Sequence, residues 1–178
     1  QSNEFFVSLY KSRSENYIFV DCHGAITSEN HFIDANDSAS KVSLITPRKQ
    51  GVEYGTEDGG DGNFFILTNF QAKNFKVVTL KAQTTPMEEW QDYIPHDPKV
   101  YLNDIEVFEN QLILKERVNG LMRMRVQNRS TKDVVAIDMP EENCTLSSGI
   151  HVQNMQVCYI GIHVPWWFVA PINPSSSF

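Results

Sequence analysis

Short apolar runs, each soon interrupted by polar or turn-forming residues, are the dominant pattern along the chain. The segment from Asn63 to Leu80 shows this pattern most clearly. Its two arms, 63–69 and 74–80, are rich in β-branched and aromatic residues, and a mostly polar loop separates them. This arrangement predicts two neighbouring antiparallel strands.

The same kind of strand recurs three more times, always after a turn that ends in asparagine. The four asparagines are spaced by 47, 47 and 44 residues, at positions Asn16, Asn63, Asn110 and Asn154. A repeat of this length that contains several strands is typical of β-propeller blades. We therefore expect four units, the last of them incomplete. Their approximate limits are 4–50, 51–99, 100–144 and 145–178.

Each complete unit is predicted to contain four strands. Those of the first unit are 5–10, 16–22, 28–34 and 41–46. Those of the second are 51–56, 63–69, 74–80 and 89–94, and those of the third are 100–108, 110–115, 121–126 and 133–139. The fourth unit begins with 145–152 and 155–161. Pro47 and Pro95 end the outer strands of the first two units, because proline cannot donate to a strand ladder.

The third unit contains the strongest local signal. Asn119 and Gly120 stand between two strand-like runs, and a type I′ turn needs positive φ at both of its central positions. The run after the turn, Leu121–Val126, alternates in its second half as a strand with one wet face should. We therefore expect a two-residue hairpin here, with Leu114 or Lys115 opposite Met124 or Arg125.

The predicted fold class is all-β, a partial β-propeller of about three and a half four-stranded antiparallel blades. Fewer than four blades do not close a ring, so we expect a segment of a larger propeller. The segment 87–93 is too short between its prolines to be a convincing helix. Residues 1–3 resemble the remnant of a cleaved tag. An open segment leaves blade faces uncovered, and we therefore expect self-association through apolar residues such as Phe5, Phe6, Tyr159 and Trp166.

Composition narrows the possible partners. The 178 residues carry a formal net charge of −7 with no basic stripe, which argues against nucleic acid. No apolar run approaches the length of a membrane span, and we expect neither a signal peptide nor a membrane partner. Three cysteines suit reduced thiols better than a disulfide framework, so the predicted location is cytoplasmic.

Three groups of residues have the chemistry of metal or ion sites. Cysteine and histidine alternate late in the chain, but their spacings exceed those of zinc knuckles, so packing is favoured over metal; these are Cys144, His151, Cys158 and His163. The acidic segment 57–61 has carboxylates for calcium, yet it lacks EF-hand spacing and stands where a turn is needed. Three arginines could attract an acidic partner or simply cover an exposed strand face; they are Arg117, Arg123 and Arg125.

No catalytic, cofactor or metal residue is assigned from the sequence. Gly-x-Ser-x-Gly, which exposes an activated serine on a strand–turn–helix, is absent. His23, His31 and His96 have no partner that the sequence reveals. We therefore expect no peptidase or other catalytic activity from this chain alone.

Several short motifs, in order and at familiar spacing, resemble the prolyl oligopeptidase family. They are Thr27–Glu29, Arg48 with Gly51–Tyr54, Thr68–Asn69, Ala72–Lys76, Trp90 with Ile94–His96, Glu116–Arg117, Gly120–Leu121 and Arg123. Together they resemble the propeller of the oligopeptidase B branch over about three quarters of the chain. The likeness thins after Asp138, although Pro174–Phe178 resembles the end of that propeller.

This resemblance implies a two-domain serine peptidase that cuts short peptides after Lys or Arg. The propeller would cap an α/β-hydrolase domain and keep folded proteins from its active site. The catalytic Ser, Asp and His would belong to that hydrolase domain, which follows the propeller. Two alternatives stay open: a free-standing β-repeat module that binds proteins along an open blade edge, and a truncated product without a function of its own.

Overall fold

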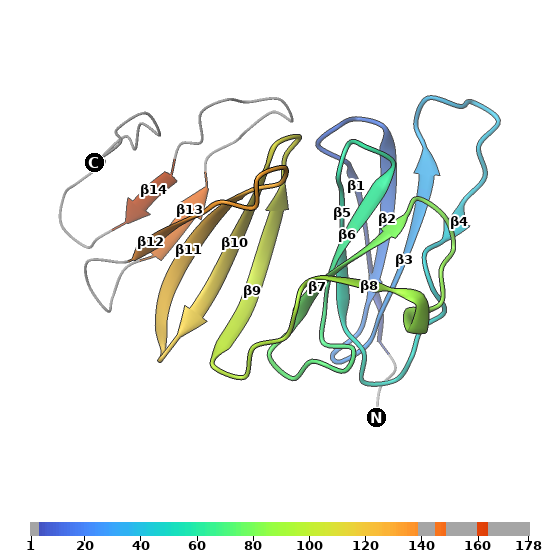
Figure 1. Ribbon diagram of the computed structural model, residues 1–178. Helices are drawn as coiled ribbons and strands as arrows, with labels where there is room; N and C mark the ends of the chain where they lie inside the picture. The colour runs from blue at the N-terminus through green and yellow to red at the C-terminus, as the bar shows by residue number, and fades with distance from the viewer. Residues whose placement is uncertain (1–3, 139–144, 149–159, 164–178) are drawn as a thin grey trace.

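The computed structural model describes residues 4–138, 145–148 and 160–163. They form three four-stranded antiparallel sheets that stand side by side, with a two-stranded sheet beyond the third (Figure 1). The described residues contain no α-helix. No helix among them, including the short 3-10 helix before β8, is long and apolar enough to cross a membrane. The prediction of an all-β partial propeller is confirmed.

In each four-stranded sheet, strands that are consecutive in sequence are neighbours. Sheet 1 consists of β1 (Phe6–Lys11), β2 (Tyr17–His23), β3 (Ser28–Asp34) and β4 (Ser43–Leu44). Sheet 2 consists of β5 (Tyr54–Asp58), β6 (Asn63–Thr68), β7 (Lys76–Lys81) and β8 (Gln91–Ile94), with a 3-10 turn, η1 (Met87–Glu89), before β8. Sheet 3 consists of β9 (Val100–Val107), β10 (Gln111–Val118), β11 (Leu121–Asn128) and β12 (Val134–Asp138). The last pair is β13 (Thr145–Ser148) and β14 (Ile160–His163).

The hairpin between β10 and β11 has the predicted turn. Asn119 and Gly120 adopt φ of 51° and 84°, the left-handed conformation that a type I′ turn requires. Leu114 lies opposite Arg125, and Lys115 lies opposite Met124. The register inferred from the Asn-Gly pair is therefore confirmed.

The first strand of sheet 2 starts later than the sequence predicts. β5 covers Tyr54–Asp58 rather than 51–56, and only residues 59–62 form the turn to β6. The backbone just before β5 is hydrogen-bonded to sheet 1 instead, because the Val52 carbonyl accepts a hydrogen bond from the amide of Ser28. Gly51, at φ 81°, turns the chain between the two sheets. Glu57 and Asp58 consequently belong to a strand and not to a turn.

Two apolar layers hold the three sheets together. Between sheets 1 and 2, the ring of Phe64 meets those of Phe19 and Phe32 edge-on, with centroids 5.3 and 5.1 Å away. Between sheets 2 and 3, Phe65 packs among side chains of β9 and β10, including Leu112 and Leu114. Sheet 2 is therefore covered on both faces, as a blade inside a propeller must be.

Candidate functional site

We call the side on which β5 and β9, the first strands of sheets 2 and 3, approach their neighbouring sheets the inner side of the array. The close backbone approaches between sheets 1, 2 and 3 join β5 to β2 and β3, and β9 to β5 and β6. The outer strands β4, β8 and β12 take no comparable part in them. Charged side chains gather where β5 and β9 end. This inner charge cluster consists of Arg13, Glu57, Asp104, Glu106 and Lys115.

Alternation along β9 places the two carboxylates of this strand on one face. Ile105 and Val107 point into the apolar layer beside sheet 2, so Asp104 and Glu106 point the other way. Pairing with β10 puts Lys115 directly opposite Asp104. The register between β10 and β9 shifts immediately after Lys115, because the pairing is irregular there. The ion pairs of Lys115 therefore lie next to this irregularity.

Ion pairs from two directions converge on Glu106. The Nζ of Lys115 lies 2.7 Å from Glu106 Oε1 and 3.0 Å from Asp104 Oδ2. From the other side, Nη2 of Arg13 lies 3.5 Å from Glu106 Oε2. The Arg13 guanidinium also covers the ring of Phe108, with its central carbon 4.5 Å from the ring centroid. Arg13 belongs to the turn between β1 and β2, so this side chain links sheet 1 directly to sheet 3.

Glu57 has an unusual protonation equilibrium within the cluster. Burial raises the pKa of its carboxyl to about 7, and the negative charges of Asp104, Glu106 and Asp58 act in the same direction, while Arg13 opposes them. For Lys115, burial lowers the pKa, but hydrogen bonds to Glu106 and Asp104 outweigh it and the net change is upward. A cavity of about 360 Å³ adjoins Glu57 and is lined by residues 10–13 and Phe19.

The arrangement can attract and hold positive charge on the inner side of the blades. Its three carboxylates outweigh its two cations only while Glu57 is ionised, and Glu57 gains or loses its charge near neutral pH. Nothing in the sequence pattern identified the cluster, since Glu57 was expected in a turn and Asp104 and Glu106 read as ordinary strand residues. The period-two alternation of β9 is the one signal that could have paired the last two.

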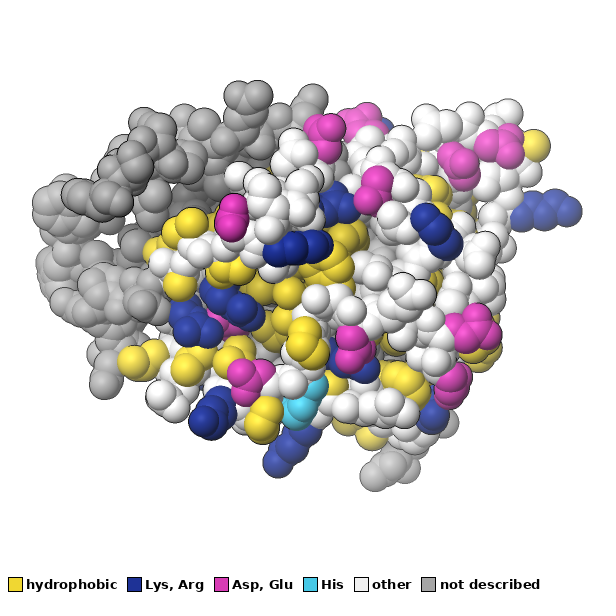
Figure 2. All heavy atoms as spheres, viewed as in Figure 1, with side chains coloured by type: hydrophobic (Ala, Val, Ile, Leu, Met, Phe, Trp, Pro, Cys, Tyr) yellow, Lys and Arg dark blue, Asp and Glu magenta, His cyan; other side chains and the backbone are white. Residues whose placement is uncertain are grey.

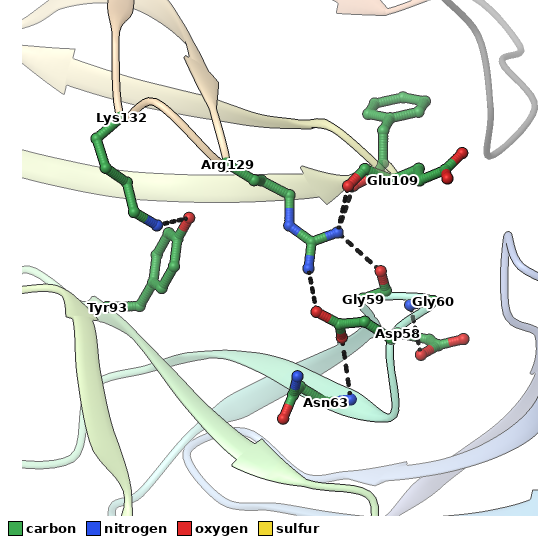
Figure 3. A network of polar contacts seen from close by, with 10 residues as sticks. Asp58, Gly59, Gly60, Asn63, Tyr93, Glu109, Arg129 and Lys132 are labelled. Carbon is green, nitrogen blue, oxygen red and sulfur yellow. Dashed lines mark hydrogen bonds and ion pairs between the residues drawn. The ribbon is translucent and has the colours of Figure 1, made fainter.

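A second polar network joins sheets 2 and 3 at Arg129 (Figure 3). Its Nη1 donates to the carbonyls of Gly59, Phe108 and Glu109 at 2.7, 2.7 and 2.9 Å. Its Nη2 donates to Asp61 at 3.0 Å, and the guanidinium lies over the ring of Phe65. Nearby, Lys132 donates to the hydroxyl of Tyr93 at 2.7 Å, as Figure 3 also shows. These contacts fix the β5–β6 turn against sheet 3.

The acidic segment 57–61 is engaged within the protein. Asp58 is 1% exposed and accepts hydrogen bonds from the Ser14 hydroxyl and the Gly60 amide, while Asp61 pairs with Arg129. Among the residues that the structure describes, no three His, Cys, Asp or Glu side chains are placed to hold a metal ion. Of the cysteine and histidine series, Cys144, His151 and Cys158 lie outside the described residues. The backbone of His163 ends β14.

The arginines of sheet 3 have different environments. Arg123 and Arg125 both bind Glu116, whose side chain is fully buried, whereas Arg117 is exposed and contacts the sulfur of Met122 at 3.7 Å. The sequence did not predict that Glu116, which binds both Arg123 and Arg125, would be buried. Of the histidines, His23 pairs with Asp21 at 3.0 Å, His31 lies on β3, and His96 follows β8.

Comparison with known sequences identifies the family. The model of the family described as prolyl oligopeptidase, N-terminal β-propeller domain, matches residues 1–161. Dipeptidyl aminopeptidase BI of Pseudoxanthomonas mexicana is 29% identical over 71% of this chain and 17% of its own length. Protease 2 of Moraxella lacunata is 28% identical over 79% of this chain and 20% of its own length. The chain thus spans about a fifth of the length of these relatives.

Solved structures show the same fold. Oligopeptidase B from Leishmania major superposes with a TM-score of 0.79 at 20% identity, over 91% of this chain and 24% of that protein. Oligopeptidase B from Trypanosoma brucei, solved in a closed form with bound antipain, also gives 0.79, at 23% identity over 91% and 25% of the two chains. With its repeated four-stranded sheets and the family match over residues 1–161, the chain belongs to the prolyl oligopeptidase family and is part of its N-terminal β-propeller domain.

Proposed function

We propose that this chain is the gating and scaffolding propeller segment of a serine oligopeptidase that cleaves short peptides after Lys or Arg. The observation that carries the proposal is the inner charge cluster, in which three carboxylates stand on the first strands of neighbouring blades. A peptide that carries a basic residue before its scissile bond is attracted to such a surface before it reaches the active site. We place the enzyme in the cytoplasm, because the chain has only three cysteines.

In this function the propeller contributes selection and not bond cleavage. Nucleophilic attack by serine requires an adjacent base and an oxyanion site, and we assign these to an α/β-hydrolase domain of the full-length protein. The blades restrict what reaches that domain, so short peptides pass while folded proteins do not.

The test uses the full-length protein with matched fluorogenic peptides that carry Arg, Lys, Gln or Pro before the scissile bond. We expect a higher kcat/KM for Arg and Lys, and lower rates for longer peptides with the same cleavage site. Equal rates for Arg and Gln, or faster cleavage after Pro, would contradict the assigned specificity.

The isolated chain serves as the second arm of the test. We expect no turnover of the Arg peptide by residues 1–178 alone. If the isolated chain cleaves this peptide above background and a serine-directed phosphonate abolishes the cleavage, a catalytic centre lies within this chain. That result would refute our assignment of catalysis to a separate hydrolase domain.

A further inference from the structure

A pocket away from the inner charge cluster lies between the end of β8 and the face of sheet 3. Its volume is about 390 Å³, at the lower end of the range for small-molecule sites. Apolar side chains from β8, β9 and the connection between them form its walls, and the polar side chains are those of His96, Asp97, Arg123 and Arg125. Figure 2 shows positively charged side chains beside hydrophobic ones over this part of sheet 3.

The two arginines of this pocket are held in fixed positions by one buried carboxylate. Arg123 binds Glu116 Oε1 through Nε and Nη2, both at 2.5 Å. Arg125 binds Oε2 through Nε and Nη2, at 3.0 and 2.8 Å. Glu116 is 0% exposed, and a buried carboxylate must be paired. One bidentate arginine would neutralise it, so the second leaves one positive charge in excess.

Both arginines line the pocket, and their guanidiniums keep donors that Glu116 does not engage. The bonds to Glu116 occupy Nε and Nη2 of each arginine, and neither Nη1 has a hydrogen-bond partner among the described residues. The side chains of Arg123 and Arg125 are 27% and 25% exposed. A guanidinium whose orientation is already fixed loses little conformational freedom when it binds a further oxyanion.

His96 also lines the pocket. Its Nε2 is buried and has no hydrogen-bond partner among the residues that the structure describes. The neighbouring Asp97 is exposed, and its carboxylate accepts the amide of Lys99 at 2.8 Å. This carboxylate disfavours ligands with more than one negative charge.

We infer that this pocket binds a monoanionic carboxylate attached to an apolar group, of the kind found at the C-terminus of a peptide ending in an aliphatic residue. The carboxylate accepts hydrogen bonds from the free Nη1 groups of Arg123 and Arg125. The aliphatic group lies against the apolar wall that includes Val100 and Leu102. The ring of His96 forms part of the wall of the pocket.

The experiment measures binding to the full-length protein by isothermal titration with three small probes. N-acetylleucine carries both features, N-acetylleucinamide lacks the charge, and inorganic phosphate lacks the apolar group. We expect saturable binding of N-acetylleucine and at least tenfold weaker binding of the other two. Equal binding of the amide, tighter binding of phosphate, or no saturable binding of N-acetylleucine overturns the assignment.

Matched variants locate the binding on the chain. Arg125→Gln leaves the Arg123–Glu116 pair in place, and Arg123→Gln leaves the Arg125–Glu116 pair in place, so Glu116 stays paired in both variants. Each should weaken N-acetylleucine binding at least fivefold, whereas Arg117→Gln, on the same sheet but outside the pocket, should leave it unchanged. If Arg125→Gln perturbs folding, Arg123→Gln still decides. Unchanged binding in that variant places the ligand elsewhere and refutes the site.

Discussion

Phe64 and Phe65 are consecutive on β6, yet their side chains belong to different apolar layers. Phe64, 0% exposed, packs with the aromatic rings of sheet 1, and Phe65, 3% exposed, packs with β9 and β10 of sheet 3. Opposite orientation of neighbouring residues is the ordinary geometry of a strand. Here it means that one dipeptide stabilises both faces of the middle blade.

Replacing either phenylalanine with alanine should lower the free energy of unfolding by about 3–5 kcal/mol, because each ring fills a close-packed layer. Urea denaturation of the single variants measures this change. Val135→Ala is the control, since Val135 is 63% exposed and should change stability by less than about 0.5 kcal/mol. A loss below about 1 kcal/mol for Phe64→Ala would contradict its role in the layer.

Arg129→Lys should destabilise the contact between sheets 2 and 3 by about 1–3 kcal/mol. Lysine keeps the charge, but one ammonium group cannot replace the fork that serves three carbonyls and Asp61 together. Thermal unfolding measures the effect. Arg117→Lys, at an exposed position of sheet 3, should have the melting temperature of the parent. Equal melting of both variants would show that the Arg129 network adds nothing to stability.

Stability should decrease with rising pH through the titration of Glu57. Its folded-state pKa of about 7 exceeds the ordinary glutamate value, so between these two values the folded state binds more protons than the unfolded state. The penalty of the charged carboxylate is absent below the ordinary pKa and complete above pH 7. It amounts to no more than about 3 kcal/mol.

Glu57→Gln isolates this contribution, because glutamine cannot titrate. Chemical denaturation of both proteins from pH 5 to pH 8 should show the variant gaining stability relative to the parent as the pH rises. The difference between the two proteins cancels most of the titration of other groups. A difference that stays constant with pH would show that Glu57 has an ordinary pKa.

Gly120→Val should destabilise the β10–β11 hairpin, because a β-branched residue resists the φ of 84° found there. Gly55→Val is the matched control, since Gly55 has no positive φ and an added Cβ meets nothing within 4 Å. The melting temperature of the first variant should fall, and that of the second should hold. A Gly120→Val protein that melts with the parent would show that the turn tolerates another conformation.

The isolated chain should self-associate through sheet 1. Phe6, Val7 and Leu9 on β1 are 66%, 64% and 69% exposed, and burying such surface is favourable by about 25 cal/mol per Å². Sedimentation equilibrium should detect dimers or larger species at micromolar concentration. Leu9→Lys should weaken this association, and Val135→Lys on β12 should not. A monomeric, folded parent would refute the expectation.

The sequence predicted the blade order and the hairpin in sheet 3 because both depend on local patterns. Alternation and the Asn-Gly pair encode strands and turns over a few residues. The late start of β5 was missed, because a hydrogen bond to Ser28 in another sheet decides it. Asn154, which starts the fourth repeat, and the Pro174–Phe178 motif fall outside the described residues.

The inner charge cluster and the Glu116 pairs could not be predicted for a related reason. Their partners come from different strands, and in the case of Arg13 and Glu106 from different sheets. Burial of Glu116 also contradicts the usual location of glutamate at the surface, so its residue type pointed away from the correct environment.

The reach of Arg13 across the middle blade restricts how the array can deform. Because its guanidinium binds Glu106 and covers Phe108, sheets 1 and 2 cannot separate at their inner ends without also releasing sheet 3. The contacts of Arg13 therefore oppose a hinge between sheets 1 and 2, in addition to the apolar layer that joins them. We therefore expect a gap wide enough for a peptide to open at an edge of these three sheets rather than between them.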